Sequence, residues 1–294
     1  MAAYRSVGDE PTDIGTMYQL SYTGIDAIDH GDDYALGVLA DLEGKVPEWL
    51  RAHREMEHSY PSPSSIMNCR LQQWFNARKM APDQSSPRGW KVRRAMGIIS
   101  EPYWLAVLGS GGADLTMSNE KFDCGPHMWA HPDAIMNGEF LVEIKSVSGW
   151  GYRKMLESWG GVEMVEKGHY VQAQLYMYAT GMPWTLYLTW PADFGQTQSS
   201  MRQKKRYGKY YEMQPLYLEW IPRNNDTIEM ALGRAEMIAK DKLSKTPPQR
   251  EFAGVEFNAD GKRSWPCGYC LHLGKCNDII RKEVETGEPD ITFV

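Results

Sequence analysis

Long apolar runs, a secretory leader and an excess of positive charge are all missing from this sequence. No stretch reaches the roughly 18 apolar residues that a membrane-spanning helix needs. The first residues, Met-Ala-Ala-Tyr-Arg-Ser, lack the basic and then apolar order of a secretory signal. We therefore expect a cytoplasmic protein that has no membrane partner.

The net charge is negative and cysteines are few, and both features limit the functions that the chain can have. The formal net charge of −6 argues against tight nonspecific binding to nucleic acid, although local clusters decide the encounter with phosphates. Two basic clusters occur, at 88–94 and 202–209, and the alternative interpretation of each is a solvated face. Only five cysteines are present. In a reducing compartment, clustered cysteines bind metal more often than they form disulfides.

A chain of 294 residues with 42% hydrophobic residues can bury a large core, in one domain or two. Residues 1–58 are acidic and weakly periodic, so we expect an N-terminal extension with helices near 32–43 and 46–57. The main domain is then 59–294. No internal repeat or low-complexity tract is present.

The main domain alternates helical and strand-like segments, which indicates a mixed α/β fold. Helices are expected over 90–108, 170–180 and 226–243, and strands over 185–190 and 216–221. Pro102 either kinks the first helix or begins a second one capped by Ser100. Asp226 is the expected N-cap of the last helix.

The clearest local signal is a β-hairpin. The dipeptide Asn137-Gly138 separates two apolar runs, 127–136 and 140–147, and Asn-Gly favours a tight hairpin turn. Alternation along the second strand places Glu143 and Lys145 on the face opposite to Phe140, Val142 and Ile144.

Asp133, on the first strand of the hairpin, can reach the face that carries Glu143 and Lys145. Carboxylates in a mostly apolar sheet carry a desolvation cost, which a hard divalent cation such as Mg²⁺ removes. A lysine beside them can hold the attacking water. The alternative is a surface Glu–Lys pair on an exposed strand.

Two flanking helices add further polar groups. Glu101 follows the first basic cluster and lies four residues after Gly97. The helix expected at 170–180 carries two Gln–Tyr pairs at a spacing of four residues, Gln172 with Tyr176 and Gln174 with Tyr178. Long amides beside aromatic rings suit contacts to nucleotide and phosphate, and the alternative is an amphipathic helix with a polar edge.

The order Gly-x-x-x-Glu, Pro-Asp, Glu-x-Lys and Gln-x-x-x-Tyr resembles the RecB-type branch of the PD-(D/E)xK nuclease superfamily. The segments Tyr-Val-Gln-Ala-Gln and His-Pro-Asp-Ala-Ile are also similar to the phage lambda-type exonucleases. One cysteine before these motifs and Cys-x₂-Cys-x₅-Cys after them is a pattern similar to the CRISPR-associated exonuclease of the RecB type. The resemblance covers 64–278.

The resemblance implies a restriction-endonuclease-like α/β core, in which helices flank a mixed central sheet. It implies a DNA exonuclease that depends on Mg²⁺ or Mn²⁺, acting in a bacterial, archaeal or phage-infected cell. The implied metal ligands are Glu101, Asp133, Glu143 and the carbonyl of Ile144. Lys145 would orient the attacking water, and Gln172 with Tyr176 would contact substrate or brace the site.

The cysteines of the pattern are Cys69, Cys267, Cys270 and Cys276. In the proteins that the chain resembles, such cysteines hold a [4Fe–4S] cluster that clamps the C-terminal segment. Judged by spacing alone, four thiolates suit Zn²⁺ as well, and His272 offers another zinc ligand. Cys124 lies outside the pattern and is expected to be a core thiol.

The partners implied by the resemblance are single-stranded DNA or duplex ends, a second copy of the chain, and proteins of recombination or CRISPR adaptation. Two other functions stay open. One is a catalytically silent DNA-binding protein on a nuclease scaffold, and the other is a zinc-stabilised interaction module.

Overall fold

The computed structural model of the chain describes residues 11–37, 39–41, 44, 61–83, 88–117, 121–125, 128–157, 160–192, 215–249, 251, 267 and 270–286. The strands are β1 Leu115–Met117, β2 Phe122–Asp123, β3 Trp129–Ala130, β4 Ala134–Met136, β5 Phe140–Val147, β6 Trp184–Pro191 and β7 Tyr217–Pro222. The helices are α1 Ile14–Asp29, α3 Arg70–Ala77, α4 Arg88–Ser110, α5 Gly149–Glu157, α6 Gly161–Val165, α7 Lys167–Thr180, α9 Asn225–Leu243 and α10 Leu273–Thr286, with a 3₁₀ turn, η1, at Pro63–Ser65.

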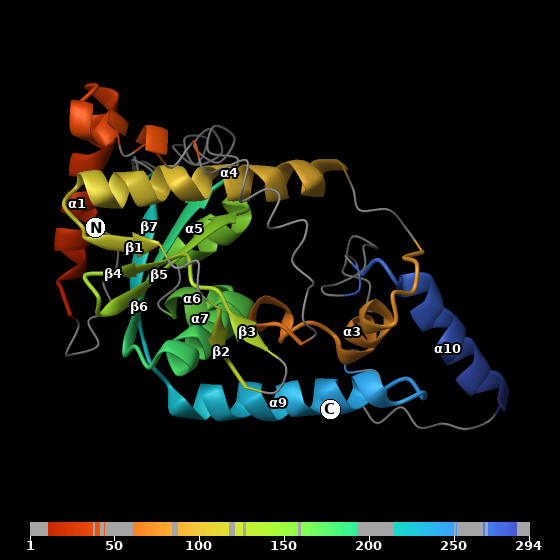
Figure 1. Cartoon of the computed structure of the whole chain (residues 1–294). Helices are drawn as coiled ribbons and strands as arrows, with labels where there is room; N and C mark the ends of the chain where they lie inside the picture. The colour runs from red at the N-terminus through yellow and green to blue at the C-terminus, as the bar shows by residue number, and fades with distance from the viewer. Residues whose placement is uncertain are drawn as a thin grey trace.

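A five-stranded mixed sheet forms the centre of the molecule, in the order β1-β4-β5-β6-β7, and helices flank it (Figure 1). The pair β5–β6 is parallel, whereas β4–β5 and β6–β7 are antiparallel. A parallel pair needs a crossover connection, and α5, α6 and α7 supply it. The expected mixed α/β fold, with a central sheet flanked by helices, is confirmed.

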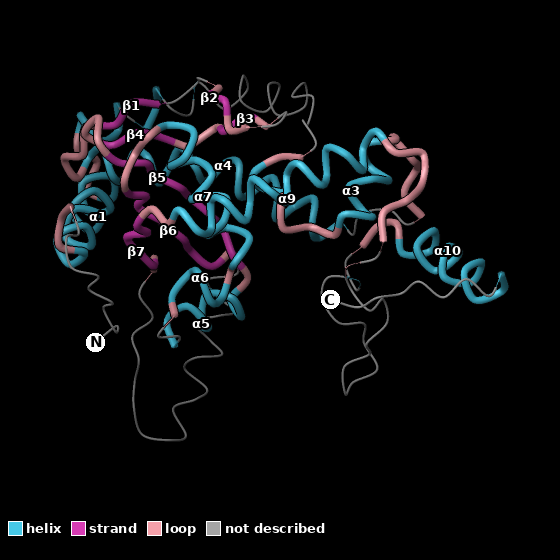
Figure 2. Tube along the Cα trace, turned by 90° about the horizontal axis from the view of Figure 1, so that it is seen from below, coloured by secondary structure: helices cyan, strands magenta, loops and turns pink. Residues whose placement is uncertain are grey.

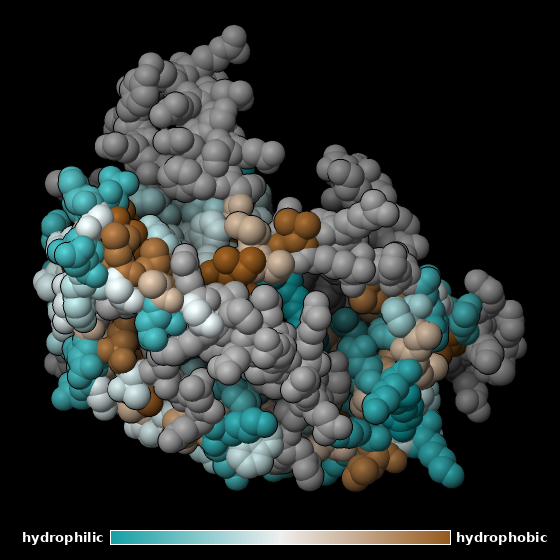
Figure 3. All heavy atoms as spheres, turned by 45° about the horizontal axis from the view of Figure 1, so that its top comes forward, coloured by the Kyte–Doolittle hydropathy of each residue, from teal (hydrophilic) through white to brown (hydrophobic). Residues whose placement is uncertain are grey.

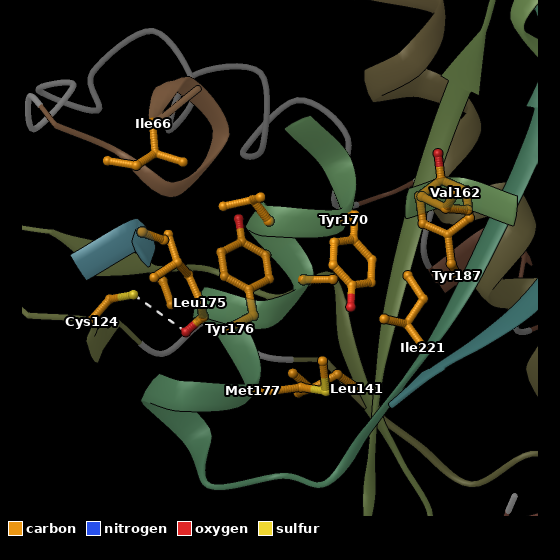
Figure 4. Packing of buried hydrophobic residues seen from close by; sticks show 14 of the residues in the cluster. Ile66, Cys124, Leu141, Val162, Tyr170, Leu175, Tyr176, Met177, Tyr187 and Ile221 are labelled. Carbon is orange, nitrogen blue, oxygen red and sulfur yellow. Dashed lines mark hydrogen bonds between the residues drawn. The ribbon is translucent and has the colours of Figure 1, made fainter. Parts of the chain in front are cut away.

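The side chains of β5 divide between two hydrophobic cores. Val142 and Ile144 pack in the core that α1 and α4 complete. Leu141 and Val147 pack in the other core, which α7 covers (Figure 4). Burying each such aliphatic side chain contributes about 1.5–3 kcal/mol, so the alternation along β5 holds helices on both faces.

The core under α7 also contains the cysteine that lies outside the cysteine pattern. Cys124 is fully buried, and its thiol donates a hydrogen bond to the carbonyl of Leu175 at 3.3 Å (Figure 4). Burial raises the pKa of this thiol to about 12. The expectation of a core thiol is confirmed.

The hairpin forms as expected at its turn but not along its whole first strand. Asn137 and Gly138 both have positive φ, 55° and 71°, as the tight turn requires. The predicted strand 127–136 is instead divided into β3 and β4, which belong to different sheets. Pro132 lies between them and has no N–H with which to continue a ladder.

Helix α1 was missed by the sequence analysis, which placed helices at 32–43 and 46–57. The second of these ranges lies outside the described residues, whereas 33–37 and 39–41 are helical. Helix α1 crosses the C-terminal part of α4 and packs against it (Figure 1). At the contact, a Cβ on Gly24 would approach the carbonyl oxygen of Val107 to 1.9 Å, so only glycine fits there.

Residues before 58 thus contribute to the core that packs on the central sheet. The indole N–H of Trp220 donates to the carbonyl of Thr12 at 2.8 Å, and the N–H of Leu218 donates to the hydroxyl of Tyr18 at 2.9 Å. The domain boundary at 58/59 stays a prediction, but α1 is packed against β7 and α4.

Two helix details differ from expectation. Helix α4 continues through Pro102, and the Ser100 hydroxyl donates to the carbonyl of Gly97 instead of capping a new helix. Asn224, rather than Asp226, is the N-cap of α9, because its side chain accepts the N–H of Thr227 at 3.0 Å.

Helices α3 and α10 lie beyond the sheet (Figures 1 and 2). Helix α9 packs against α7 in the core of the sheet and extends to α3, which lies beside it. Arg70 of α3 holds Asp241 of α9 through two hydrogen bonds of 2.7 and 2.8 Å. Arg234 holds both oxygens of Glu251, and Glu251 accepts the N–H of Arg70. We refer to α3, α10 and the cysteines of the pattern as the cysteine lobe.

Figure 3 shows the face that α4 crosses, where apolar side chains lie among polar ones. Three of the exposed apolar side chains follow one side of α4: Val92, Met96 and Ile99. None of the helices in the described ranges is long and apolar enough to cross a membrane.

Candidate active site

The hairpin brings the two acidic residues of its strands together. Ala134 pairs with Val142 in the antiparallel register, so Asp133, one residue earlier, stands opposite Glu143. The carboxylate of Asp133 accepts the main-chain N–H of Ile144 at 2.6 Å. A side chain just before β4 therefore binds the backbone of β5, which fixes the Asp133 carboxylate beside the strand.

Glu143 and Lys145 form an ion pair inside the protein. Glu143 is fully buried, and the ammonium group of Lys145 contacts its Oε1. The same ammonium lies 3.5 Å from the carbonyl oxygen of Ile144. The alternative of a surface Glu–Lys pair on an exposed strand is wrong, because β5 is the central strand of the sheet and is covered on both faces.

Helix α4 brings a third carboxylate to this position. A Cβ on Gly97 would lie 3.2 Å from the hydroxyl of Ser146, so the helix passes close to the end of β5 where glycine permits it. Glu101 follows one turn later and interacts electrostatically with Asp133, Lys145 and Glu143. The three sequence-predicted carboxylates are thus brought together with the predicted lysine.

The electrostatics of the site are those of carboxylates that are desolvated and crowded. Burial raises the pKa of Glu143 to about 8, Asp133 adds to the increase, and Lys145 opposes it. Burial and then Asp133 raise the pKa of Glu101 well above its ordinary value. Burial alone would lower the pKa of Lys145, but Glu143 and Asp133 outweigh it and raise that pKa. The lysine is therefore held as a cation.

Helix α7 closes the site from the crossover side. The amide of Gln172 donates to the hydroxyl of Tyr176 at 2.8 Å, and both side chains are buried. Burial and then Glu143 raise the pKa of Tyr176, which places this hydroxyl in the field of the carboxylates. The predicted Gln172–Tyr176 pair therefore lies at the site.

The second Gln–Tyr pair does not lie there. The amide of Gln174 donates to the carbonyl of Pro222 at 2.8 Å, and its oxygen accepts the N–H of Asn224 at 2.7 Å. This side chain joins α7 to the β7–α9 connection, and Tyr178 is exposed. A spacing of four residues along a helix cannot tell which of two adjacent pairs faces the sheet.

Sequence analysis missed two groups beside Lys145. Tyr187 of β6 stands opposite Glu143 in the parallel register, and its hydroxyl lies 2.9 Å from Nδ1 of His169 on α7. Burial and then Lys145 lower the pKa of His169 to about 3, so the imidazole is neutral. The spacing of His169, three residues before Gln172, is a signal that places both on one helix face.

The chemistry of these groups fits a hard divalent cation. Within the described residues, Oε2 of the buried Glu143 has no hydrogen-bond partner, whereas Oε1 contacts the ammonium of Lys145. Oxygen donors that lack partners in a desolvated site are suited to Mg²⁺ or Mn²⁺. Across the described ranges, no three His, Cys, Asp or Glu side chains are arranged to hold a metal ion.

The cysteine lobe gathers the cysteines from both ends of the main domain. Cys270 interacts electrostatically with Cys69 and Cys267, and Cys69 interacts with Cys267. Cys276 packs with Cys69 in one apolar cluster. These cysteines are free of disulfides. Their thiol donor set fits an iron–sulfur cluster or Zn²⁺, but where the structure describes them they are not arranged as a ligand set.

Hydrogen bonds also connect the elements of the cysteine lobe. Burial raises the pKa of Cys69, while the N–H groups of Gln72 and Leu71 at the start of α3 oppose that increase. The N–H of Lys275 at the start of α10 donates to Asp83 at 2.8 Å, and Nε2 of His272 lies 2.9 Å from the side-chain oxygen of Asn76. These contacts join α10 to α3 without a metal.

No family model and no curated protein matches the chain. Among solved structures, it is similar to the alkaline exonuclease LHK-Exo from Laribacter hongkongensis, with 13% identity and a TM-score of 0.44 over 62% of this chain and 86% of that one. The complex of LHK-Exo with dAMP gives 12% identity, the same TM-score and the same coverage. The protein SSO0001 gives 14% identity and a TM-score of 0.40 over 78% of this chain and 91% of that one. At these scores the likeness decides nothing about function, for which the site geometry has to be considered.

Proposed function

We propose that the protein is a nuclease of the PD-(D/E)xK type, and in particular a DNA exonuclease that depends on Mg²⁺ or Mn²⁺. The observation that carries this proposal is the meeting of Glu101, Asp133 and Glu143 around Lys145 in a desolvated site. These residues come from a helix and from both strands of a hairpin. The segments Tyr-Val-Gln-Ala-Gln and His-Pro-Asp-Ala-Ile, which are similar to the lambda-type exonucleases, support action at DNA ends.

A purely structural role explains this arrangement poorly. Three carboxyl groups beside one ammonium cannot all ionise without leaving uncompensated negative charge in a desolvated place, and such an arrangement costs stability. Strongly perturbed pKa values that arise from burial together with charged neighbours are typical of functional sites. The carboxylates, with the carbonyl of Ile144, would hold the metal, which would neutralise the scissile phosphate and lower the pKa of a bound water.

The residues of the chain have separate tasks in the proposed hydrolysis. The water oxygen bonds to phosphorus while the bond from phosphorus to the leaving oxygen breaks. Lys145, held as a cation by Glu143, orients that water and stabilises the negative charge that develops on the phosphate. The hydrogen bond from Ile144 keeps Asp133 in place, and the Gln172–Tyr176 pair braces the wall opposite.

The test uses end-labelled linear DNA, single- and double-stranded, and a closed circle, each with Mg²⁺, Mn²⁺ or EDTA. We expect metal-dependent cleavage of linear DNA and none of the circle. Lys145→Ala and Asp133→Ala should each lower the rate at least about 100-fold, as the loss of a positioned catalytic group does. Lys240→Ala is the matched control, because Lys240 is exposed at the end of α9.

Equal cleavage by either site variant would contradict the site assignment. Binding of DNA without cleavage under any metal condition would favour the catalytically silent binding protein. Cleavage of the circle would show an endonuclease, and the preference for linear DNA would then be wrong.

We also propose that the cysteine lobe holds a [4Fe–4S] cluster through Cys69, Cys267, Cys270 and Cys276. The support is the thiol donor set and the gathering of cysteines from opposite ends of the main domain. Anaerobically purified protein should be brown and contain iron and acid-labile sulfide, and Cys276→Ser should lose both. A colourless protein that contains zinc would establish the zinc alternative instead.

A further inference from the structure

Trp150 is displayed on the surface at the start of α5. Its side chain is 63% exposed, although the same helix buries Gly151, Tyr152 and Met155. The buried residues attach α5 to the core, so the indole projects from a fixed element. A large aromatic ring on a rigid support gains more from being covered by a partner than a mobile one does, because little entropy is lost.

Trp150 follows the strand that carries the proposed active site within a few residues. Strand β5 ends at Val147 and α5 begins at Gly149, so Trp150 follows Lys145 by five residues. Even a fully extended chain of that length spans at most about 18 Å. Ser146, which α4 approaches closely at Gly97, lies between Lys145 and Trp150 in the sequence. The backbone of Trp150 therefore lies within about 18 Å of that of Lys145, so a strand bound at the site can extend to the ring.

A positively charged side chain, that of Lys154, lies beside the Trp150 ring. The ammonium of Lys154 lies 5.7 Å from the centre of the Trp150 ring, because the two residues are four apart on the exposed side of α5. An aromatic face beside a positive charge matches the two parts of a nucleotide. The base stacks on the ring, and the phosphate meets the cation.

We propose that Trp150 stacks on an unpaired base of the DNA strand whose backbone enters the site, while Lys154 contacts the phosphate of that nucleotide. This inference rests on the proposed nuclease function and specifies its substrate. A base inside a duplex has both faces covered by its neighbours, so only a single strand or a frayed end can offer a free face. The preferred substrate therefore presents an unpaired base, as a single strand or a frayed duplex end does.

The experiment measures binding rather than cleavage, on the full chain in EDTA. The probes are a fluorescent oligothymidylate and an oligonucleotide of the same length and charge whose sugars carry no bases. The wild type should bind the oligothymidylate more tightly. Trp150→Ala should weaken that binding about 5- to 150-fold, the range that base stacking supplies, and leave binding of the abasic strand unchanged.

Three further variants separate stacking from charge and from damage to the fold. Trp150→Phe keeps a ring and should retain most of the affinity for oligothymidylate. Lys154→Gln should weaken binding of both strands alike and reduce the salt dependence. Trp129→Ala removes another exposed tryptophan, 45% exposed on β3, and should change neither affinity.

Equal binding of oligothymidylate by Trp150→Ala and the wild type would overturn the inference, and so would an equal loss for both strands. The nuclease proposal fails differently, since it requires cleavage. A protein that shows the expected stacking but never cleaves DNA refutes only the nuclease. A protein that cleaves DNA with an unchanged KM in Trp150→Ala refutes only the stacking.

Discussion

Replacing Glu101 with glutamine should make the metal-free protein more stable while it destroys metal-dependent activity. Burial, Asp133 and Glu143 all raise the pKa of Glu101, so its ionised form is disfavoured in the fold. Glutamine has nearly the same shape and carries no charge. Removal of a disfavoured buried charge at a functional site adds about 0.5–2 kcal/mol to the free energy of unfolding. This gain raises Tm by a few degrees.

The gain depends on pH in a definite direction. The pKa of Glu101 is higher in the folded chain than in the unfolded chain, where a glutamate titrates near its ordinary value of about 4.3. Above that value the folded protein binds more protons than the unfolded one, so its stability falls as pH rises. The advantage of Glu101→Gln should therefore be absent near pH 4 and increase toward pH 8.

A divalent cation should reverse the order of stability. Ligand binding to the folded state contributes about 2.7 kcal/mol when the free ligand is 100 times Kd. The wild type should gain this amount from Mg²⁺ or Mn²⁺, whereas Glu101→Gln, which lacks one ligand, should gain less. The measurement is thermal unfolding by circular dichroism at pH 5 and pH 8, with and without metal.

Glu139→Gln is the matched control, because Glu139 is exposed at the hairpin turn beside the same strands. It should leave Tm and its response to metal unchanged. If Glu101→Gln is less stable than the wild type at pH 8 without metal, the carboxylate is favourable in the fold. Such a result would refute the proposal that the fold bears an unfavourable Glu101 carboxylate in order to bind a cation.

Three other outcomes are expected. Arg234→Ala should lower the free energy of unfolding by about 1–3 kcal/mol in urea titrations, because the charge-assisted hydrogen bonds to Glu251 are lost. An unchanged midpoint would show that α9 holds the cysteine lobe by other contacts. Gly24→Ala should cost about 1–3 kcal/mol or more, since its Cβ would meet a carbonyl of α4 at 1.9 Å; wild-type stability in the same titration would contradict the packing of α1. Gln172→Ala should lower kcat with little change in Tm, whereas Gln174→Ala should lower Tm and leave kcat alone, and the opposite result would exchange their roles.

Local patterns account for the relative placement of Asp133, Glu143 and Lys145 that sequence analysis predicted. The turn at Asn137-Gly138 and the alternation along β5 depend on neighbouring residues, so they are legible in a short stretch of sequence. They place Glu143 and Lys145 on one face and Asp133 across from them. A wrong detail, the unbroken strand 127–136, arose because the effect of Pro132 on the ladder was not considered.

The amino-acid sequence by itself determined the hairpin, the acidic and basic residues of the site and the mixed α/β class, because periodicity and turn chemistry are local properties. Only the tertiary structure decided that α1 completes a core, that Tyr187 and His169 adjoin Lys145, and that Gln172 rather than Gln174 faces the sheet. Those contacts join residues far apart in the chain, and their free energy comes from burial and pairing that exist only once the sheet has formed.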